Sequence, residues 1–176
     1  MKIKTTTIGA FPKPACTPIG DWFPDTEDED ARGADKGLLQ RWSISDYEEN
    51  LKRAGENAES DFLNAIQEVV DDQVKAGIDI PTDGEVRREN YIYYQCRRIK
   101  GIDFNTVTNT SVRSGAYKAD LPTITGPVTL EKTMLGRDYI TAQKFCSNPV
   151  KITIPGPMTI IDSIADDYYN NDKQLG

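Results

Sequence analysis

Two nearly identical phrases in this chain, residues 123–130 (TITGPVTL) and 153–160 (TIPGPMTI), constrain its fold more than any other feature. Each is a short, β-branched run that ends in Gly-Pro-x-Thr, and the glycines, Gly126 and Gly156, lie 30 residues apart. About 30 residues is the length of one strand-plus-helix unit. Because Gly and Pro end a strand and Thr suits the cap of the next segment, the repeat predicts two successive strands with similar ends.

A long amphipathic helix is predicted before this repeat. Residues 45–48 (SDYE) form a capping box, which is typical of a helix start, and Gly77 is a natural helix end. The apolar side chains between them recur at helical spacing on one face: Phe62, Ile66, Val69, Val70 and Val74. Further helices are predicted near residues 90–99 and 138–146.

Short β-branched runs on either side of the long helix, at residues 3–8 and 78–80, predict two more strands. Alternating strands and helices indicate a parallel α/β fold, in which ligands bind at the carboxyl ends of the strands. A closed (β/α)8 barrel takes about 250 residues. We therefore predict that residues 1–176 form roughly the first half of a single TIM-barrel domain, with an acidic surface loop around residues 13–38.

Composition excludes several classes of protein. The net charge is −7 and the pI about 4.7, which disfavours a nucleic-acid partner. No apolar run is long enough to span a membrane, and the first residues do not resemble a signal peptide. Three scattered cysteines predict no disulfide framework and favour the cytoplasm. Because histidine is absent, this chain alone cannot carry a Ser-His-Asp or a His-based zinc mechanism.

The best candidate for chemistry is an acidic pair, Asp83 and Glu85, just after the strand at residues 78–80. The pair is suited to acid–base work or to holding an ammonium group, but two carboxylates at this spacing are also common in ordinary loops. In that second interpretation Asp83 caps the turn and Glu85 pairs with Arg88 on the surface. Nearby basic residues form either an anion-attracting rim or a solvated helix face: Arg87, Arg88, Arg97, Arg98 and Lys100.

Three blocks of the sequence resemble, in order and spacing, the catalytic domain of the cobalamin-independent methionine synthase family. They are residues 5–14 (TTTIGAFPKP), 78–94 (IDIPTDGEVRRENYIYY) and 154–160 (IPGPMTI). The resemblance implies a TIM barrel and methyl transfer from methyltetrahydrofolate to the thiol of homocysteine. It also implies a zinc ion, which deprotonates a thiol of pKa ~8.5. The family's zinc ligands, a His, two Cys and a Glu, lie in the second half of the barrel, beyond this chain.

On the homocysteine side, the resemblance transfers roles to four residues. Ile8 and Gly9 match the backbone that receives the carboxylate of the amino acid, and Ala10 stands where the family usually has Ser. Glu85 matches the carboxylate that holds the ammonium group. Asp83 stands where the family often has His, so the resemblance assigns it no role.

On the folate side, Arg113 and Ser114 roughly match an Arg-Cys pair, and the family's folate-stacking Trp falls near Ser163. The leading hypothesis is thus part of a zinc-dependent methyltransferase whose partners are homocysteine, a methyl donor and the missing barrel half or a second copy. A corrinoid-linked methyltransferase or a uroporphyrinogen decarboxylase-like enzyme has the same barrel, and the missing Trp favours it. A non-catalytic fragment that needs a second chain is the third hypothesis.

Overall fold

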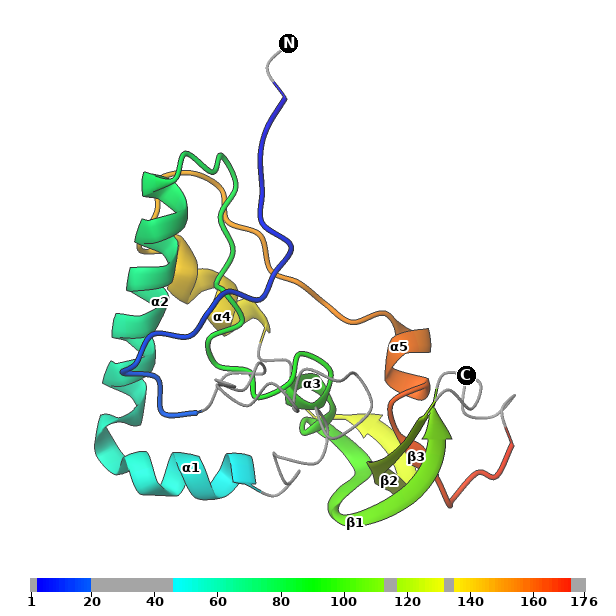
Figure 1. Ribbon diagram of the computed structural model, residues 1–176. Coiled ribbons are helices and arrows are strands. Elements are labelled where there is room, and N and C mark those ends of the chain that lie inside the picture. Colours follow the sequence, from blue (N-terminus) through cyan, green and yellow to red (C-terminus); the bar gives the residue numbers. More distant parts are fainter. Residues whose placement is uncertain (1–2, 20–45, 113–116, 132–134, 172–176) are drawn as a thin grey trace. The chain divides into compact units, whose positions relative to one another are not determined.

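A computed structural model describes residues 3–19, 46–112, 117–131 and 135–171 of the chain (Figure 1). The protein is α/β, as predicted. Its elements in chain order are α1 (Asp46–Ala54), the 3-10 turn η2 (Gly55–Asn57), α2 (Ala58–Lys75), α3 (Tyr93–Cys96), β1 (Ile99–Val112), β2 (Tyr117–Leu130), α4 (Leu135–Gln143), α5 (Pro157–Ile161) and β3 (Ala165–Asp166). Most of the predicted acidic loop, residues 20–38, lies outside the described residues.

The chain divides into two compact units, which are described separately. Unit 1 consists of Met1–Asp21, Asn50–Glu89 and Thr133–Ile154, and it contains α2 and α4. Unit 2 consists of Trp22–Glu49, Asn90–Lys132 and Pro155–Gly176, and it contains the three-stranded sheet, in the order β1-β2-β3, with α3 and α5. In Figure 1, α2 is the long helix of unit 1, and β1 with β2 is the long curved hairpin of unit 2.

Three segments of unit 1 that are far apart in the sequence lie parallel to one another. Thr6 forms a parallel bridge with Ile80, and Thr82 forms one with Lys151. The backbone N–H of Lys151 donates to the carbonyl of Pro81 at 2.8 Å. The segment around Ile80 is therefore central, between the amino-terminal segment and the segment around Lys151.

The predicted strands at residues 3–8 and 78–80 are extended segments joined by single bridges, not regular strands. Their parallel direction, with α2 between them in the sequence, agrees with a strand–helix–strand unit. The other parallel neighbour of the central segment is the one at Lys151. The prediction that the first repeated phrase continues this parallel set is wrong.

The predicted long helix is divided into α1 and α2 by the turn η2, because Gly55 has φ +57°, outside the helical region. The predicted apolar face of α2 is largely confirmed, and its buried residues are Phe62, Ala65, Ile66, Val69, Val70 and Gln73. Val74 does not belong to that face, since it is 41% exposed. The N–H of Gly77 donates to the carbonyl of Val74 at 3.0 Å, which confirms a capped end there. Ser45 lies outside the described residues.

The first repeated phrase lies inside β2, which pairs antiparallel with β1 and parallel with β3. The ladder shifts register at Gly101, which faces residues 125–128. A Cβ on Gly101 would lie 2.5 Å from the carbonyl oxygen of Gly126, and its φ is +89°, so this position requires glycine. Pro127 has no N–H to donate, and a bulge is where a strand tolerates proline. The Gly-Pro pair therefore bends a strand here and does not end one.

The second phrase matches its prediction only in part. Residues 152–156 are not a strand, so the predicted strand is wrong, although Lys151 just before them forms a parallel bridge. Gly156 is the N-cap of α5, with Pro157 as the first helical residue, so a helix does begin where the phrase was predicted to turn. Thr159 lies within α5, so it does not cap the segment as predicted. The two phrases thus share their letters but not their structure.

The remaining predicted helices are shorter or shifted. α3 covers only part of residues 90–99, and α4 starts before the predicted residue 138. The core of unit 2 lies between α3, the sheet and the loop before β3: Ile92, Tyr93, Cys96, Ile124 and Ile164. In the ranges that the structure describes, no helix has both the length and the apolar character needed to span a membrane.

Candidate functional site

The loop after the central segment of unit 1 brings Glu85 next to Gly9. Oε1 of Glu85 lies only 2.7 Å from the position that a Cβ on Gly9 would occupy. The hydroxyl of Thr82 donates to the carbonyl of Gly9 at 2.9 Å. The N–H of Phe11 donates to the carbonyl of Gly84 at 3.1 Å. These contacts join the segment at Gly9 to the loop that contains Asp83 and Glu85.

The backbone of this loop is unusual at two consecutive residues. Glu85 has φ +56°, a left-handed conformation that is uncommon for any residue except glycine and costs roughly 1–3 kcal/mol. Gly84 before it has φ +66°, and a Cβ there would lie 2.5 Å from Cγ1 of Val69 on α2. A non-glycine residue held in this conformation by its surroundings is a feature that clusters at functional sites.

The carboxylate of Glu85 is anchored through one oxygen. The hydroxyl of Thr153 donates to Oε1 at 2.5 Å, and Nη1 of Arg88 lies 3.7 Å from the same oxygen. The Glu85 side chain is 12% exposed. Within the described part of the chain, Oε2 accepts no hydrogen bond. One carboxylate oxygen is therefore fixed and the other remains available to a ligand.

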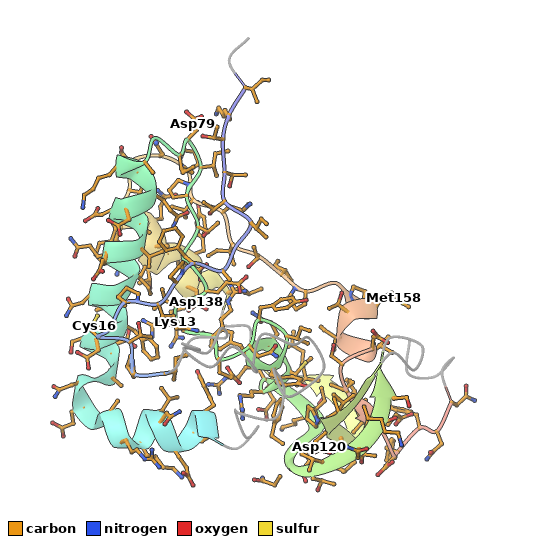
Figure 2. All side chains as sticks on the ribbon, in the orientation of Figure 1. Lys13, Cys16, Asp79, Asp120, Asp138 and Met158 are labelled. Carbon is orange, nitrogen blue, oxygen red and sulfur yellow. The ribbon has the colours of Figure 1, made fainter. Side chains whose placement is uncertain are left out.

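Arg88 is the buried cation behind this carboxylate. Its Nη1 donates to the carbonyl of Thr153 at 2.9 Å and to the Thr153 hydroxyl at 3.1 Å. Its Nη2 donates to Oδ2 of Asp83 at 3.5 Å, and its carbonyl accepts a bond from Nζ of Lys13 at 2.8 Å. Lys13 is labelled in Figure 2. The pairing of Glu85 with Arg88 therefore exists but is buried, so the surface-pair interpretation is wrong.

Asp83 is almost completely buried, at 2% exposure. Burial raises the pKa of its carboxyl from 3.8 to about 6; the charge of Arg88 opposes the rise, while Asp138 and Glu85 add to it. Its Oδ1 accepts a bond from the N–H of Glu85 at 3.3 Å. Asp83 thus does cap the turn, as one interpretation predicted, and it also faces Arg88.

Arg87 is a second buried arginine, and it links the loop after Asp83 and Glu85 to two helices. It donates to both carboxylate oxygens of Glu59 on α2, at 2.8 and 2.6 Å, and these bonds lower the pKa of Glu59. Its Nε lies 3.7 Å from Asp138 on α4, which Figure 2 labels. Its guanidinium carbon lies 4.8 Å from the centre of the Phe62 ring. Because Arg87 and Arg88 are buried, the prediction of a solvated helix face is wrong for both.

The other basic residues lie in unit 2 and behave differently. The guanidinium carbon of Arg97 lies 4.8 Å from the centre of the Tyr47 ring and 4.3 Å from that of Phe104. Arg98 and Lys100 are exposed. Arg98 follows α3 and Lys100 lies in β1, so these two residues are solvated but do not form the predicted helix face.

The remaining predicted site residues have different outcomes. The side chain of Ile8 is 94% exposed and Ala10 is exposed. Among the described residues, the backbone N–H groups of Gly9 and Ala10 have no hydrogen-bond partner. Arg113 and Ser114 lie outside the described residues.

Sequence reasoning missed Thr153, and it placed Arg88 in a surface pair or at an anion-attracting rim, not in a buried position. The available signal for Thr153 was its position at the start of the second phrase, where a strand end was predicted. Within the described ranges, no three His, Cys, Asp or Glu side chains gather in a way that could hold a metal ion.

Comparison with known proteins bears on these residues. The family described as "Cobalamin-independent synthase, Catalytic domain" matches residues 3–174. A methionine synthase of Saccharolobus solfataricus is 30% identical over 174 residues, which are 98% of this chain and 44% of that protein. A methionine synthase of Sulfolobus acidocaldarius is 28% identical over 179 residues, covering 98% of this chain and 43% of that protein.

A solved structure is similar over nearly the whole chain. It is a B12-independent methionine synthase from Shewanella sp. W3-18-1 in complex with selenomethionine, with a TM-score of 0.72 and 30% sequence identity. The match covers 97% of this chain and 43% of that one. The chain therefore spans less than half the length of the relatives it matches, and it belongs to the cobalamin-independent synthase catalytic-domain family.

Proposed function

We propose that this chain is the first half of the catalytic TIM barrel of a methionine synthase. The complete enzyme transfers a methyl group from methyltetrahydrofolate to the thiol of homocysteine. The observation that carries the proposal is the contact of Gly9 with Glu85, two residues 76 positions apart that come from the ends of neighbouring parallel segments. Residues at such ends share the catalytic rim of a barrel.

The two sides of this site suit the two charges of an amino acid. Oε2 of Glu85 binds the ammonium group, and its partner oxygen stays fixed on Thr153. The N–H groups of Gly9 and Ala10 bind the carboxylate of the same molecule. Arg88 does not compete for the carboxylate of the amino acid, because its guanidinium is buried and bonded to Thr153 and Asp83.

The outer segments of unit 1 support a missing second half. Ile3 and Ile8 on the amino-terminal segment are 86% and 94% exposed, and Ile154 on the opposite outer segment is 68% exposed. Large apolar side chains on unpaired extended segments are the groups that further strands would cover. We propose that the rest of the barrel covers them, supplied by the same polypeptide or by a second chain.

Zinc belongs to the proposed complete enzyme, with its ligands in the second half of the barrel. The described part of this chain offers no three-ligand cluster, so no step assigned to these residues involves zinc. We expect the isolated 176-residue chain to bind no stoichiometric zinc. The full-length protein should contain zinc and lose activity to a chelator. Zinc bound by the isolated chain would contradict this division of the site.

The methyl donor has two candidates, since Ser163 stands where the family's stacking Trp is expected. This residue favours a corrinoid-linked donor as the second candidate. Assays of the full-length enzyme with methyltetrahydrofolate and with methylcobalamin separate the two. Turnover with methylcobalamin alone would replace folate as the donor but leave the homocysteine site unchanged.

The test of the site is Glu85→Gln in the full-length enzyme. Removing one partner of a desolvated charge pair typically costs about 2–5 kcal/mol, so the KM for homocysteine should rise at least tenfold while bound zinc stays constant. Glu68→Gln, at an exposed position of α2, is the matched control and should change neither value. Unchanged kinetics for Glu85→Gln would reject the assigned role.

A further inference from the structure

We infer that Thr153 is a positioning residue for Glu85. Its hydroxyl, oriented by Arg88, fixes the carboxylate so that one oxygen faces the ammonium group of the amino acid. The inference rests on the proposed function and adds to it a residue that neither the sequence motifs nor the resemblance identifies.

The three groups form a directed chain of hydrogen bonds. Nη1 of Arg88 donates to the Thr153 hydroxyl at 3.1 Å, and the hydroxyl donates to Oε1 of Glu85 at 2.5 Å. Arginine can only donate, so its bond leaves the single proton of the hydroxyl to Glu85. A cationic donor at one end and a carboxylate acceptor at the other strengthen both bonds.

The backbone and the methyl group of Thr153 are held as well. Its carbonyl accepts a bond from the same Nη1 of Arg88 at 2.9 Å. Its Cγ2 lies 2.7 Å from the position that a Cβ on Gly9 would occupy, so the methyl group packs over the glycine. Both the hydroxyl and the methyl group of Thr153 therefore make contacts, which restricts rotation of the side chain. Serine would retain only the hydroxyl at this place, and valine only the branching.

Without the hydroxyl, the remaining contact of Glu85 Oε1 is Arg88 at 3.7 Å. The carboxylate is then free to turn toward that buried cation and away from the ligand. Among the described residues, Thr153 and Arg88 are the only groups that bind the Glu85 carboxylate, so loss of the hydroxyl removes its shortest contact. A lost hydrogen bond to a charged group corresponds to roughly a tenfold change in binding.

The experiment uses the full-length enzyme with Thr153→Val, Thr153→Ser and the control Thr129→Val, which lies at an exposed position of β2. Thr153→Val should raise the KM for homocysteine about tenfold and change kcat less than about twofold. Thr153→Ser should restore most of the affinity. Thr129→Val should match the wild type. A silent Thr153→Val, or a serine variant as impaired as the valine variant, would overturn the inference.

A double-variant cycle separates positioning from a general structural role. In the Glu85→Gln background, Thr153→Val should add less than about a twofold change, because both substitutions act through one carboxylate. Additive effects would mean that Thr153 acts on its own. The thiol 4-mercaptobutanoate, which lacks the ammonium group, should respond to neither substitution.

The outcomes also distinguish the two proposals. If Glu85→Gln leaves the kinetics unchanged, the proposed homocysteine site fails. If Glu85→Gln impairs binding but Thr153→Val does not, the site stands and the positioning role of Thr153 fails.

Discussion

Oδ2 of Asp83 lies 3.5 Å from Nη2 of Arg88, and each residue is 2% exposed. The pKa of the Asp83 carboxyl is nevertheless raised to about 6. The arginine therefore offsets only part of the cost of burying the carboxylate. Asp138 and Glu85 add negative charge around the same group and hold the pKa up further.

The first prediction concerns stability against pH. The folded pKa of Asp83 is above its ordinary value of 3.8, so Asp83 contributes stability that is fully present below about pH 4. That contribution is lost as the pH rises through about 6. Relative to Asp83→Asn, which does not titrate, the wild type should therefore lose about 2–3 kcal/mol of unfolding free energy between pH 4 and 8.

Urea unfolding of both full-length proteins across this pH range measures the difference. Carboxyl groups that do not interact with Asp83, such as Glu59, are present in both proteins and cancel. A difference that stays constant with pH would contradict the raised pKa.

The second prediction concerns the space around Gly9. A methyl group there would meet both Glu85 Oε1 and Thr153 Cγ2 at 2.7 Å, so Gly9→Ala must displace the carboxylate. The KM for homocysteine should rise severalfold, and stability should fall by about 1–3 kcal/mol, as for other overpacked sites. The control is Gly136→Ala in α4, where a Cβ meets nothing within 4 Å. It should stabilise the protein by about 0.5–1 kcal/mol and leave the kinetics unchanged.

The third prediction separates the backbone strain of Glu85 from its charge. Glu85→Ala and Glu85→Gly both remove the carboxylate, but only glycine adopts φ +56° without strain. The glycine variant should therefore be about 1 kcal/mol more stable to urea than the alanine variant, although both lose affinity for homocysteine. Equal stabilities would mean that the left-handed conformation is not retained in solution.

The fourth prediction concerns the link from Arg87 to Glu59. A lysine cannot donate to both carboxylate oxygens as the guanidinium does, and its charge would remain buried near Asp138. Arg87→Lys should cost about 1.5–3 kcal/mol of unfolding free energy. The same change at exposed Arg98 should stay within about 0.5 kcal/mol. A loss of the same size at both positions would contradict the structural role of Arg87.

Patterns along the chain predicted the features that depend on neighbouring residues. Helical spacing identified the buried face of α2, and Gly77 identified its end. The pair Asp83 and Glu85 was predicted to be a candidate site because it follows a β-branched run. Each of these signals lies within one or two turns of the residues it concerns.

Features that depend on distant pairing could not be predicted in this way. The phrase at residues 123–130 has the local pattern of a strand end, but pairing with β1 turns its Gly-Pro pair into a bulge. Arg87 and Arg88 have the charge pattern of a solvated face, and only their partners across the fold permit burial. Thr153 meets Glu85 across 68 positions, so nothing near it in the sequence marks the contact.

The two parallel bridges of unit 1 can form only in a fixed order while the ribosome synthesises the chain. Thr6 can form its bridge only after Ile80, 74 positions later, has been synthesised. Thr82 can form its bridge only after Lys151, 69 positions later. At roughly 5–20 residues per second, each delay lasts several seconds, far longer than a helix needs to form. During that time α2 can coil while its apolar face still lacks the neighbours that will cover it. The nascent chain therefore presents a ready target for chaperones before the Gly9–Glu85–Thr153 cluster can exist.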